Sequence, residues 1–476
     1  MESSGFDPLT EDTAAQVGFR QAQGGEVRAT VLRLMPQAVV LEIYDPSLVL
    51  RASEVLSDFK IGLRNRTIYS GHAVVRTLFN GGPPIVAEVA LDKDSWRDLQ
   101  FVSGVLGAEK LGDDFKEFVQ GWQKFYLVGN DYKVVIADLQ TFLTDLRLWL
   151  EQVELGLPSA SEAQRSEVEN QIANRLRSQV TAALSNMFER FEEVSDKIED
   201  DLQPAHRAFG QRQLHPHLLC APFIHRTYTK PLGYAGDYEM MNMIARNGFE
   251  GNSLYAKLTN AYLLDQVGPQ AVRNRVKFLR GIIQDETSRI ARLGRTASIY
   301  SIACGPAKEV EDFIVESPLA ERAQFRLLDF NEETLLYTGN RMDEIRREYH
   351  RRTSVKLIKN SVQNLLRGNN KPAAEAATYD LIYCSGLYDY LNDRVIRALN
   401  THFYERLQPG GLLVVGNFAP NTPVKNFIEH FLEWFLIYRD GRQLAALAPE
   451  QVSPADCRVI AEPTGTNIFL EVRKPQ

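Results

Sequence analysis

Hydrophobic and polar residues alternate in different ways along the chain, and each pattern predicts a different structure. Residues 26–34, 38–44, 72–79 and 84–91 are short runs rich in Val, Ile, Leu and Thr, separated by turn residues. Such runs are typical of β-strands joined by tight turns. Because several of them lie close together in the sequence, we predict a small antiparallel barrel.

A helical period replaces this pattern after Trp96. Apolar residues recur three and four positions apart in two long stripes, over residues 136–150 and 168–198. The stretch 155–159 interrupts the stripes, so we predict an antiparallel helical hairpin. The hairpin is interpreted as a spacer that packs the barrel against the rest of the chain, or as a coiled coil that makes a homodimer.

From Ser298 onward, strands and helices alternate. Strands are predicted at 297–303, 324–330, 355–361, 378–386 and 410–418, helices from Lys308 and over 332–350, 392–406 and 424–438, and a closing hairpin at 457–463 and 466–473. Alternation of this kind predicts right-handed βαβ units and a mostly parallel sheet.

The expected fold is therefore a multidomain α/β protein. We predict a barrel domain over residues 1–100, a helical hairpin linker over 101–205 and a helical lid or substrate region over 206–290. Residues 291–476 are predicted to form a Rossmann-like sheet that ends in an antiparallel hairpin.

Composition narrows the function classes. The chain carries a net charge of −7 and no basic block, so nucleic-acid binding is not expected. Its four cysteines are scattered without a CxxC pair, which predicts neither a metal site nor a disulfide framework. No signal peptide and no stretch of about 20 apolar residues is present, so we expect a cytoplasmic protein without a membrane span.

The first strand of the α/β part runs into a glycine and then a helix. Gly305 lets a ligand approach the backbone closely, and N–H groups at the helix start can meet a carboxylate or ribose oxygens. Asp329 ends the next strand, where an acid can accept both ribose hydroxyls of a nucleoside. The alternative is that Asp329 or Asn331 caps helix 332–350, but we favour the ligand role for Asp329.

Polar and small residues also follow the third and fourth strands. Ser361 and Val362 occupy the place where a side chain and a backbone N–H commonly meet an adenine ring, although a plain loop fits equally well. Ser385 and Gly386 are small enough to admit a ligand, and aromatic residues that include Tyr388 follow them as a wall. The chain lacks the GxGxxG sequence that a nicotinamide-dependent dehydrogenase would need.

In order and spacing, Gly305, Asp329, Ser361, the strand at 379–386 and the turn and strand at 407–415 resemble the motif series of class I S-adenosylmethionine-dependent methyltransferases. The resemblance implies S-adenosylmethionine as the cofactor. It implies as binding residues Cys304, Gly305, Pro306, Asp329, Phe330, Ser361, Val362, Ser385, Gly386, Tyr228 and Asp237. The loop has one glycine where the family usually has two or three, but Pro306 suits a first helical position, so we expect the loop to function.

The wider arrangement, including the sequence PLGYAGDYEMMN at 231–242, resembles bacterial proteins named for biosynthesis of 3-hydroxypalmitic acid methyl ester, an extracellular quorum signal. Their N-terminal part is PilZ-like. This resemblance implies methyl transfer to a fatty-acid carboxylate.

PilZ domains bind cyclic di-GMP through an RxxxR arm and a (D/N)xSxxG turn. Here Arg28 and Arg33 are spaced one residue too far apart, and the turn that contains Asp45 and Ser47 closes with Leu50 instead of glycine. We therefore expect a barrel that serves for packing and does not bind cyclic di-GMP.

Residues 215–240 are the expected lid over the cofactor, because they combine polar, aromatic and glycine residues. Tyr228, Tyr234 and Tyr238 are candidates to wall the sulfonium, while Asp237 is a candidate to hold the cofactor's ammonium. Arg226 and Lys230 would pair with an acidic acceptor or the cofactor carboxylate. A packing or turn-forming role is the alternative for each of these residues.

The acceptor decides whether a base is needed. A carboxylate is already ionised near neutral pH, whereas a hydroxyl needs a general base, for which His225 is the candidate. His225, Tyr234 and Tyr388 are thus the predicted catalytic residues. The predicted helix 424–438 is apolar nearly all round, so it is interpreted as the wall of an acyl pocket, as a buried helix or as an interface.

The leading prediction is a methyltransferase for a small acidic acceptor, with a 3-hydroxy fatty acid as the example. One alternative is methylation of another metabolite or of a protein side chain. The other is a non-catalytic binding protein that responds to a nucleotide.

Overall fold

The computed structural model of the 476-residue chain forms two compact units, residues 1–125 with 231–234, and residues 126–230 with 235–476. The structure describes residues 16–20, 26–35, 37–43, 50, 54–63, 66–79, 85–96, 112, 115–116, 119, 127–157, 162–366 and 378–476.

Six strands of the first unit form a closed barrel in the order β1-β2-β3-β6-β5-β4, with every neighbouring pair antiparallel. They are β1 (Gln16–Arg20), β2 (Glu26–Met35), β3 (Ala38–Ile43), β4 (Val55–Leu63), β5 (Arg66–Phe79) and β6 (Ile85–Leu91). Phe19, Phe59 and Tyr69 are buried and pack ring to ring in its interior. The predicted antiparallel barrel is present, and β1 and β4 add two strands that the sequence pattern did not indicate.

The residues compared with the cyclic di-GMP motifs are only partly described. Arg33 on β2 is exposed and Leu50 is buried. The side chain of Arg28 and residues Asp45 and Ser47 lie outside the described residues. The expectation about cyclic di-GMP therefore stays a prediction.

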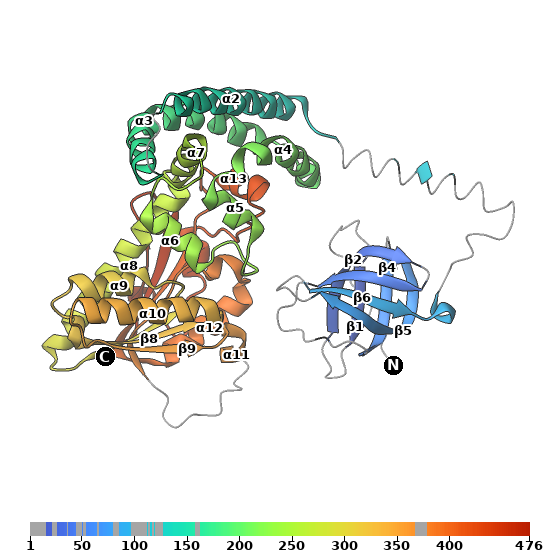
Figure 1. Ribbon diagram of the computed structural model, residues 1–476. Coiled ribbons are helices and arrows are strands. Elements are labelled where there is room, and N and C mark those ends of the chain that lie inside the picture. The colour runs from blue at the N-terminus through green and yellow to red at the C-terminus, as the bar shows by residue number, and fades with distance from the viewer. Residues whose placement is uncertain are drawn as a thin grey trace. The chain divides into compact units, whose positions relative to one another are not determined.

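Helices form the first part of the second unit. They are α2 (Asn130–Leu155), α3 (Glu162–Ser195), α4 (Gln203–Leu218), α5 (Pro222–Thr229), α6 (Tyr238–Arg246), α7 (Leu254–Leu264) and α8 (Val267–Arg292). Helices α2 and α3 lie side by side as the predicted hairpin (Figure 1). Every residue of α7 is buried, because α2 and α3 both pack against it. The apolar stripes of the hairpin are thus covered within the chain.

The second part of this unit is a seven-stranded sheet in the order β12-β13-β11-β10-β7-β8-β9. Its strands are β7 (Ala297–Ile302), β8 (Ala323–Asp329), β9 (Ser354–Lys359), β10 (Tyr379–Cys384), β11 (Leu407–Phe418), β12 (Cys457–Ala461) and β13 (Asn467–Arg473). Strands β7 to β11 pair in parallel, whereas β13 is antiparallel to both β11 and β12. The Rossmann-like sheet with a terminal antiparallel hairpin is confirmed.

Helices cover both faces of this sheet. Helix α8 shares one apolar core with α9 (Lys308–Glu316) and α10 (Glu332–Glu348). On the other face, α11 (Val362–Leu366), α12 (Asp393–Glu405) and α14 (Gly441–Ala445) share a second core. Because α8 also packs in the helical layer, it connects the two parts of the unit.

The prediction of one helix over residues 424–438 is wrong. Helix α13 (Lys425–Phe431) is short, and Glu433 has a left-handed backbone with φ +47°. The chain then extends, and the Ile437 N–H donates to the Asp389 carbonyl at 2.7 Å. A backbone hydrogen bond to the neighbouring loop therefore outweighs the helical preference of an apolar sequence.

Helix α13 is fixed to α3 by one buried acid. The Glu192 carboxylate accepts the backbone N–H groups of Phe427 at 2.8 Å and Asn426 at 3.0 Å, at the beginning of α13. These are N–H groups that a helix cannot satisfy internally. Burial raises the pKa of Glu192 from 4.5 to about 7.

None of the helices within the described ranges has the length and apolar character that a bilayer crossing requires.

A pH-dependent stability follows from Glu192. Its folded-state pKa lies above the unfolded value, so the folded chain binds the proton more tightly and loses stability as pH rises from about 4.5 to about 7. We expect Glu192→Gln to remove this fall, which urea unfolding of both proteins from pH 4 to 8 measures. A constant stability difference between them across that range would contradict the expectation.

A second prediction concerns the buried cation of α7. The Lys257 ammonium pairs with Glu169 at 3.0 Å and donates to Asn170 at 3.2 Å. Lys257→Met leaves the Glu169 carboxylate with only its pair to the exposed Arg165, so unfolding should become easier by about 1.5 kcal/mol. Arg147→Gln, which breaks an exposed pair with Glu151, should cost less than about 0.5 kcal/mol. Equal losses in urea unfolding would rule out the role given to Lys257.

Candidate active site

The predicted cofactor residues of the α/β part lie in or next to the loops that follow four parallel strands. Strands β10, β7, β8 and β9 are consecutive in the sheet, so the loops at their carboxyl ends lie along one edge. Two backbone hydrogen bonds join these loops: Cys304 N–H donates to the Leu328 carbonyl at 2.9 Å, and Asn360 N–H donates to the Asp329 carbonyl at 3.0 Å. Such an edge is where ligands bind in open α/β sheets.

Asp329 and Gly305 are in direct contact. The Asp329 carboxylate accepts the Gly305 N–H at 3.0 Å with one oxygen and the Asn331 N–H at 3.0 Å with the other. Its side chain is 4% exposed, and burial raises its pKa. The Phe330 backbone N–H also bonds to this carboxylate, which offers about four acceptor positions, so about one position remains.

The helix-capping alternative applies to Asn331 and not to Asp329. Asn331 stands immediately before α10, and its side-chain oxygen accepts the Thr334 N–H at 2.9 Å. Asp329 lies two residues earlier and makes no such bond. Its carboxylate is instead directed to the two loops.

The glycine loop is held open by its backbone. Gly305 has φ +52°, a conformation that only glycine adopts without strain, and no atom lies within 4 Å of the place where a Cβ would stand. The Thr338 hydroxyl donates to the Gly305 carbonyl at 2.8 Å. Pro306 does not take the first helical position as expected, because α9 begins only at Lys308 after Ala307. The neighbouring Cys304 is buried, and burial raises the pKa of its thiol.

The next two loops present different side chains. Phe330 is 51% exposed, directly after Asp329. The Ser361 hydroxyl accepts the Asn364 N–H at 3.2 Å and so caps α11, which begins at Val362. Contacts of Ser361 and Val362 with an adenine ring stay a prediction.

An arginine that the sequence analysis missed faces the fourth loop. Gly386 follows Ser385 and has φ +88°, and the Arg275 guanidinium lies 3.1 Å from the place of its missing Cβ. Arg275 is on α8 and only 7% exposed. The available signal was one cation on the apolar stripe of that helix, between Val272 and Leu279.

Two buried acids support the loops near Arg275. Glu309 accepts the Tyr383 hydroxyl at 2.7 Å, and burial raises its pKa. Asp389 accepts the Phe418 N–H at 2.6 Å, and burial raises its pKa to about 6. Both carboxylates therefore have structural partners at the ends of β10 and β11.

Tyr388 begins the short helix η4 (Tyr388–Tyr390) and is fully buried. Its hydroxyl donates to the Asn400 side chain at 2.7 Å, and burial raises its pKa. These contacts support packing below the loop, while its catalytic role stays a prediction.

The lid segment reaches from β8 to β10. At one end, the Tyr238 hydroxyl donates to Glu333 at 2.9 Å in the first turn of α10. At the other, the place of the Gly236 Cβ lies 3.4 Å from the Tyr390 hydroxyl, next to the end of β10. Asp237 between them is 1% exposed and pairs with Arg226 at 2.8 Å. Asp237 and Arg226, which were predicted to bind the cofactor or the acceptor, thus form an ion pair with each other.

The other candidates of this segment lie as follows. His225 on α5 is exposed. The Tyr228 ring packs on His215 with 4.4 Å between ring centroids, and Lys230 donates to the Glu433 carbonyl at 2.7 Å. Tyr234 belongs to the four residues that group with the first unit. The roles predicted for His225, Tyr228 and Tyr234 stay predictions.

Comparison with solved structures finds distant similarity. A possible exported protein from Bordetella parapertussis is 16% identical with a TM-score of 0.44, covering 67% of this chain and all of its own. Magnesium protoporphyrin IX methyltransferase from Synechocystis PCC 6803, solved with S-adenosylhomocysteine, is 11% identical with a TM-score of 0.32, covering 49% of this chain and 93% of its own. An O-methyltransferase family protein from Burkholderia thailandensis is 13% identical with a TM-score of 0.33, covering 59% and 74%.

Comparison with curated proteins finds no match. Residues 233–442 match the sequence-family model described as putative methyltransferase. The matched stretch contains the loops that hold Gly305, Asp329, Ser361 and Gly386. The part of the chain from the lid through α8 to the five parallel strands is thus similar to putative methyltransferases.

Proposed function

We propose that this chain is an S-adenosylmethionine-dependent methyltransferase that acts on a small acidic acceptor. The observation that carries the proposal is the 3.0 Å hydrogen bond from Gly305 to Asp329, between the ends of two adjacent parallel strands. It lies within the stretch that matches putative methyltransferases. An acid at the end of the second strand beside a glycine loop suits the ribose of a nucleoside.

The residues at this edge fit the cofactor. The space beside Gly305 is open, and the Asp329 carboxylate retains about one acceptor position for a ribose hydroxyl. The half-exposed Phe330 ring offers a face on which adenine can stack. When bound, S-adenosylmethionine supplies a methyl group activated by its sulfonium charge.

The residues of the chain itself position the reactants and exclude water from the site. Asp329 orients the nucleoside. Gly236 and Tyr238 of the lid, which contact Tyr390 and Glu333 respectively, keep water from the edge of the sheet. An ionised carboxylate acceptor has no proton to lose, so no base is required. The sequence resemblance supports a 3-hydroxy fatty acid as one such acceptor, with a methyl ester as the product.

Asp329→Ala should weaken the binding of S-adenosylhomocysteine more than tenfold, about 1.4 kcal/mol, because the ribose loses its acceptor. Calorimetric titration of the full chain measures this. Asp343→Ala, which removes an exposed acid from α10, serves as the control and should bind as the wild type does. An unchanged affinity in Asp329→Ala would remove Asp329 from the site.

Phe330→Ala should weaken the same binding by about tenfold, since stacking of a base on an aromatic ring contributes about 1–3 kcal/mol. Phe330→Trp keeps an aromatic face and should retain the affinity. Tyr349→Ala, at the other end of α10, removes a similarly exposed ring as a control. Equal affinities of the Ala and Trp variants of Phe330 would contradict stacking.

A further inference from the structure

Arg275 is a buried cation without a strong partner. Its guanidinium donates to the Met241 sulfur at 3.5 Å, and the side chain is only 7% exposed. Sulfur is a weak acceptor, so this contact uses little of the hydrogen-bonding capacity of a group with five N–H donors. Burying such a group is costly unless a ligand or a charge pairs with it.

The nearest acids do not supply that pairing. Asp389 and Glu309 attract the Arg275 charge from a distance, but each carboxylate already accepts a hydrogen bond from another residue. Within the described part of the chain, no carboxylate oxygen lies within 4.0 Å of a guanidinium nitrogen of Arg275. A planar guanidinium in this position suits a carboxylate, which it can bind through two parallel hydrogen bonds.

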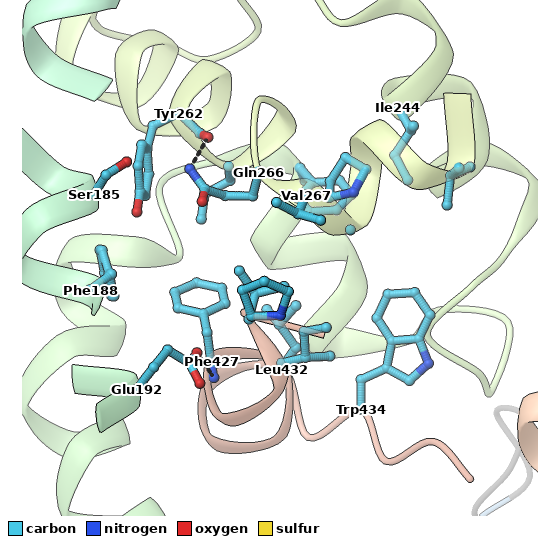
Figure 2. Close-up of a pocket in the computed structure, with 18 of the residues that line it drawn as sticks. Ser185, Phe188, Glu192, Ile244, Tyr262, Gln266, Val267, Phe427, Leu432 and Trp434 are labelled. Carbon is cyan, nitrogen blue, oxygen red and sulfur yellow. Dashed lines mark hydrogen bonds between the residues drawn. The ribbon is translucent and has the colours of Figure 1, made fainter. Parts of the chain in front are cut away.

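An apolar cavity of about 170 Å³ lies in the helical layer, and its wall includes Val272, which precedes Arg275 by three residues on α8. Aromatic and aliphatic side chains from α3, α7, α8 and the α13 region form most of its wall. Figure 2 shows Phe188, Tyr262, Phe427, Leu432 and Trp434 around it. Phe418, the last residue of β11, also lines it, so the cavity reaches the carboxyl edge of the sheet.

Two pairs of residues connect the cavity to the arginine, and a third connects it to the predicted lid. Val272 lines the cavity and lies three positions before Arg275 on the same face of α8. Ile244 lines it as well, three positions after Met241, which contacts the guanidinium. Trp434 lines it and donates through its ring nitrogen to the Tyr390 hydroxyl at 2.6 Å, beside the lid.

We propose that Arg275 and this cavity together form the acceptor site for an amphipathic carboxylic acid with a compact apolar group. Arg275 holds the carboxylate beside Gly386 at the end of β10, and the cavity takes the apolar group. This rests on the proposed methyltransferase function and narrows its acceptor.

The size of the cavity limits the apolar group. An apolar cavity of about 150 Å³ in a protein binds benzene. A cavity of about 170 Å³ therefore accommodates a ring or a short chain of about six to eight carbon atoms. A chain about twice as long would leave half of its length outside.

The test is calorimetric titration of the full chain, saturated with S-adenosylhomocysteine, with 3-phenylpropionate, octanoate and 3-hydroxyhexadecanoate. We expect the two compact acids to bind more tightly than the long one. Arg275→Gln should weaken their binding at least tenfold. Val272→Phe, which fills the cavity, should weaken it to a similar extent. Lys277→Gln removes an exposed charge from the same helix and should leave the binding of both compact acids unchanged.

Three outcomes would overturn the proposal. The first is tighter binding of the long acid, and the second is acid binding that Val272→Phe does not affect. The third is an Arg275→Gln variant that loses S-adenosylhomocysteine affinity instead, since that assigns Arg275 to the cofactor carboxylate. Failure of the proposed function can be distinguished from failure of this proposal. In the first case, wild-type protein would not bind S-adenosylhomocysteine. Titration of the acids without S-adenosylhomocysteine would still test Arg275 and the cavity.

Discussion

The candidate site depends on one carboxylate that joins two loops. The Asp329 carboxylate, at the end of β8, accepts the N–H of Gly305 in the loop after β7. It also accepts the N–H of Asn331, two residues further along the chain. Two directed bonds to a single buried acid fix both loops relative to each other. The open space beside Gly305 and the exposed ring of Phe330 lie next to the hydrogen bond between Gly305 and Asp329.

Buried charges around the site are used in two ways. Arg226 and Asp237 neutralise each other within the predicted lid, so this pair provides internal support, and the predicted ligand role of Asp237 stays a prediction. Arg275 is only 7% exposed, yet its guanidinium donates to a sulfur atom and not to a carboxylate. A charge that lacks a partner inside a protein is costly, and this difference separates a structural cation from a candidate binding residue.

The alternation of strands and helices predicted the sheet well, because buried parallel strands leave a strong apolar signal in the sequence. Asp329 and Gly305 were also found, since both stand at fixed places relative to those strands. The sequence did not reveal the end of α13 at Phe431, which depends on hydrogen bonds to a loop far away in the chain. Pro306 was misplaced for a similar reason, because the local pattern does not report where a helix begins to within two residues.

Arg275 was missed because its importance is purely spatial. One arginine on an otherwise apolar helix face has no motif, and only the fold brings it to Gly386. Likewise, the sequence did not predict the ion pair between Asp237 and Arg226. Side-chain pairing across a lid depends on turn geometry that hydrophobic periodicity does not encode.

The attachment of α13 also has a consequence for the order in which the chain folds. The helix packs against α3 and α4, and its His430 ring bonds to Tyr132 of α2 and to Gln203 of α4. Yet it is synthesised about 230 residues after the end of α3. The helical layer therefore lacks a central piece until the parallel strands have left the ribosome, and apolar surface stays uncovered throughout that interval. Folding of this unit is expected to be completed only after translation of the sheet.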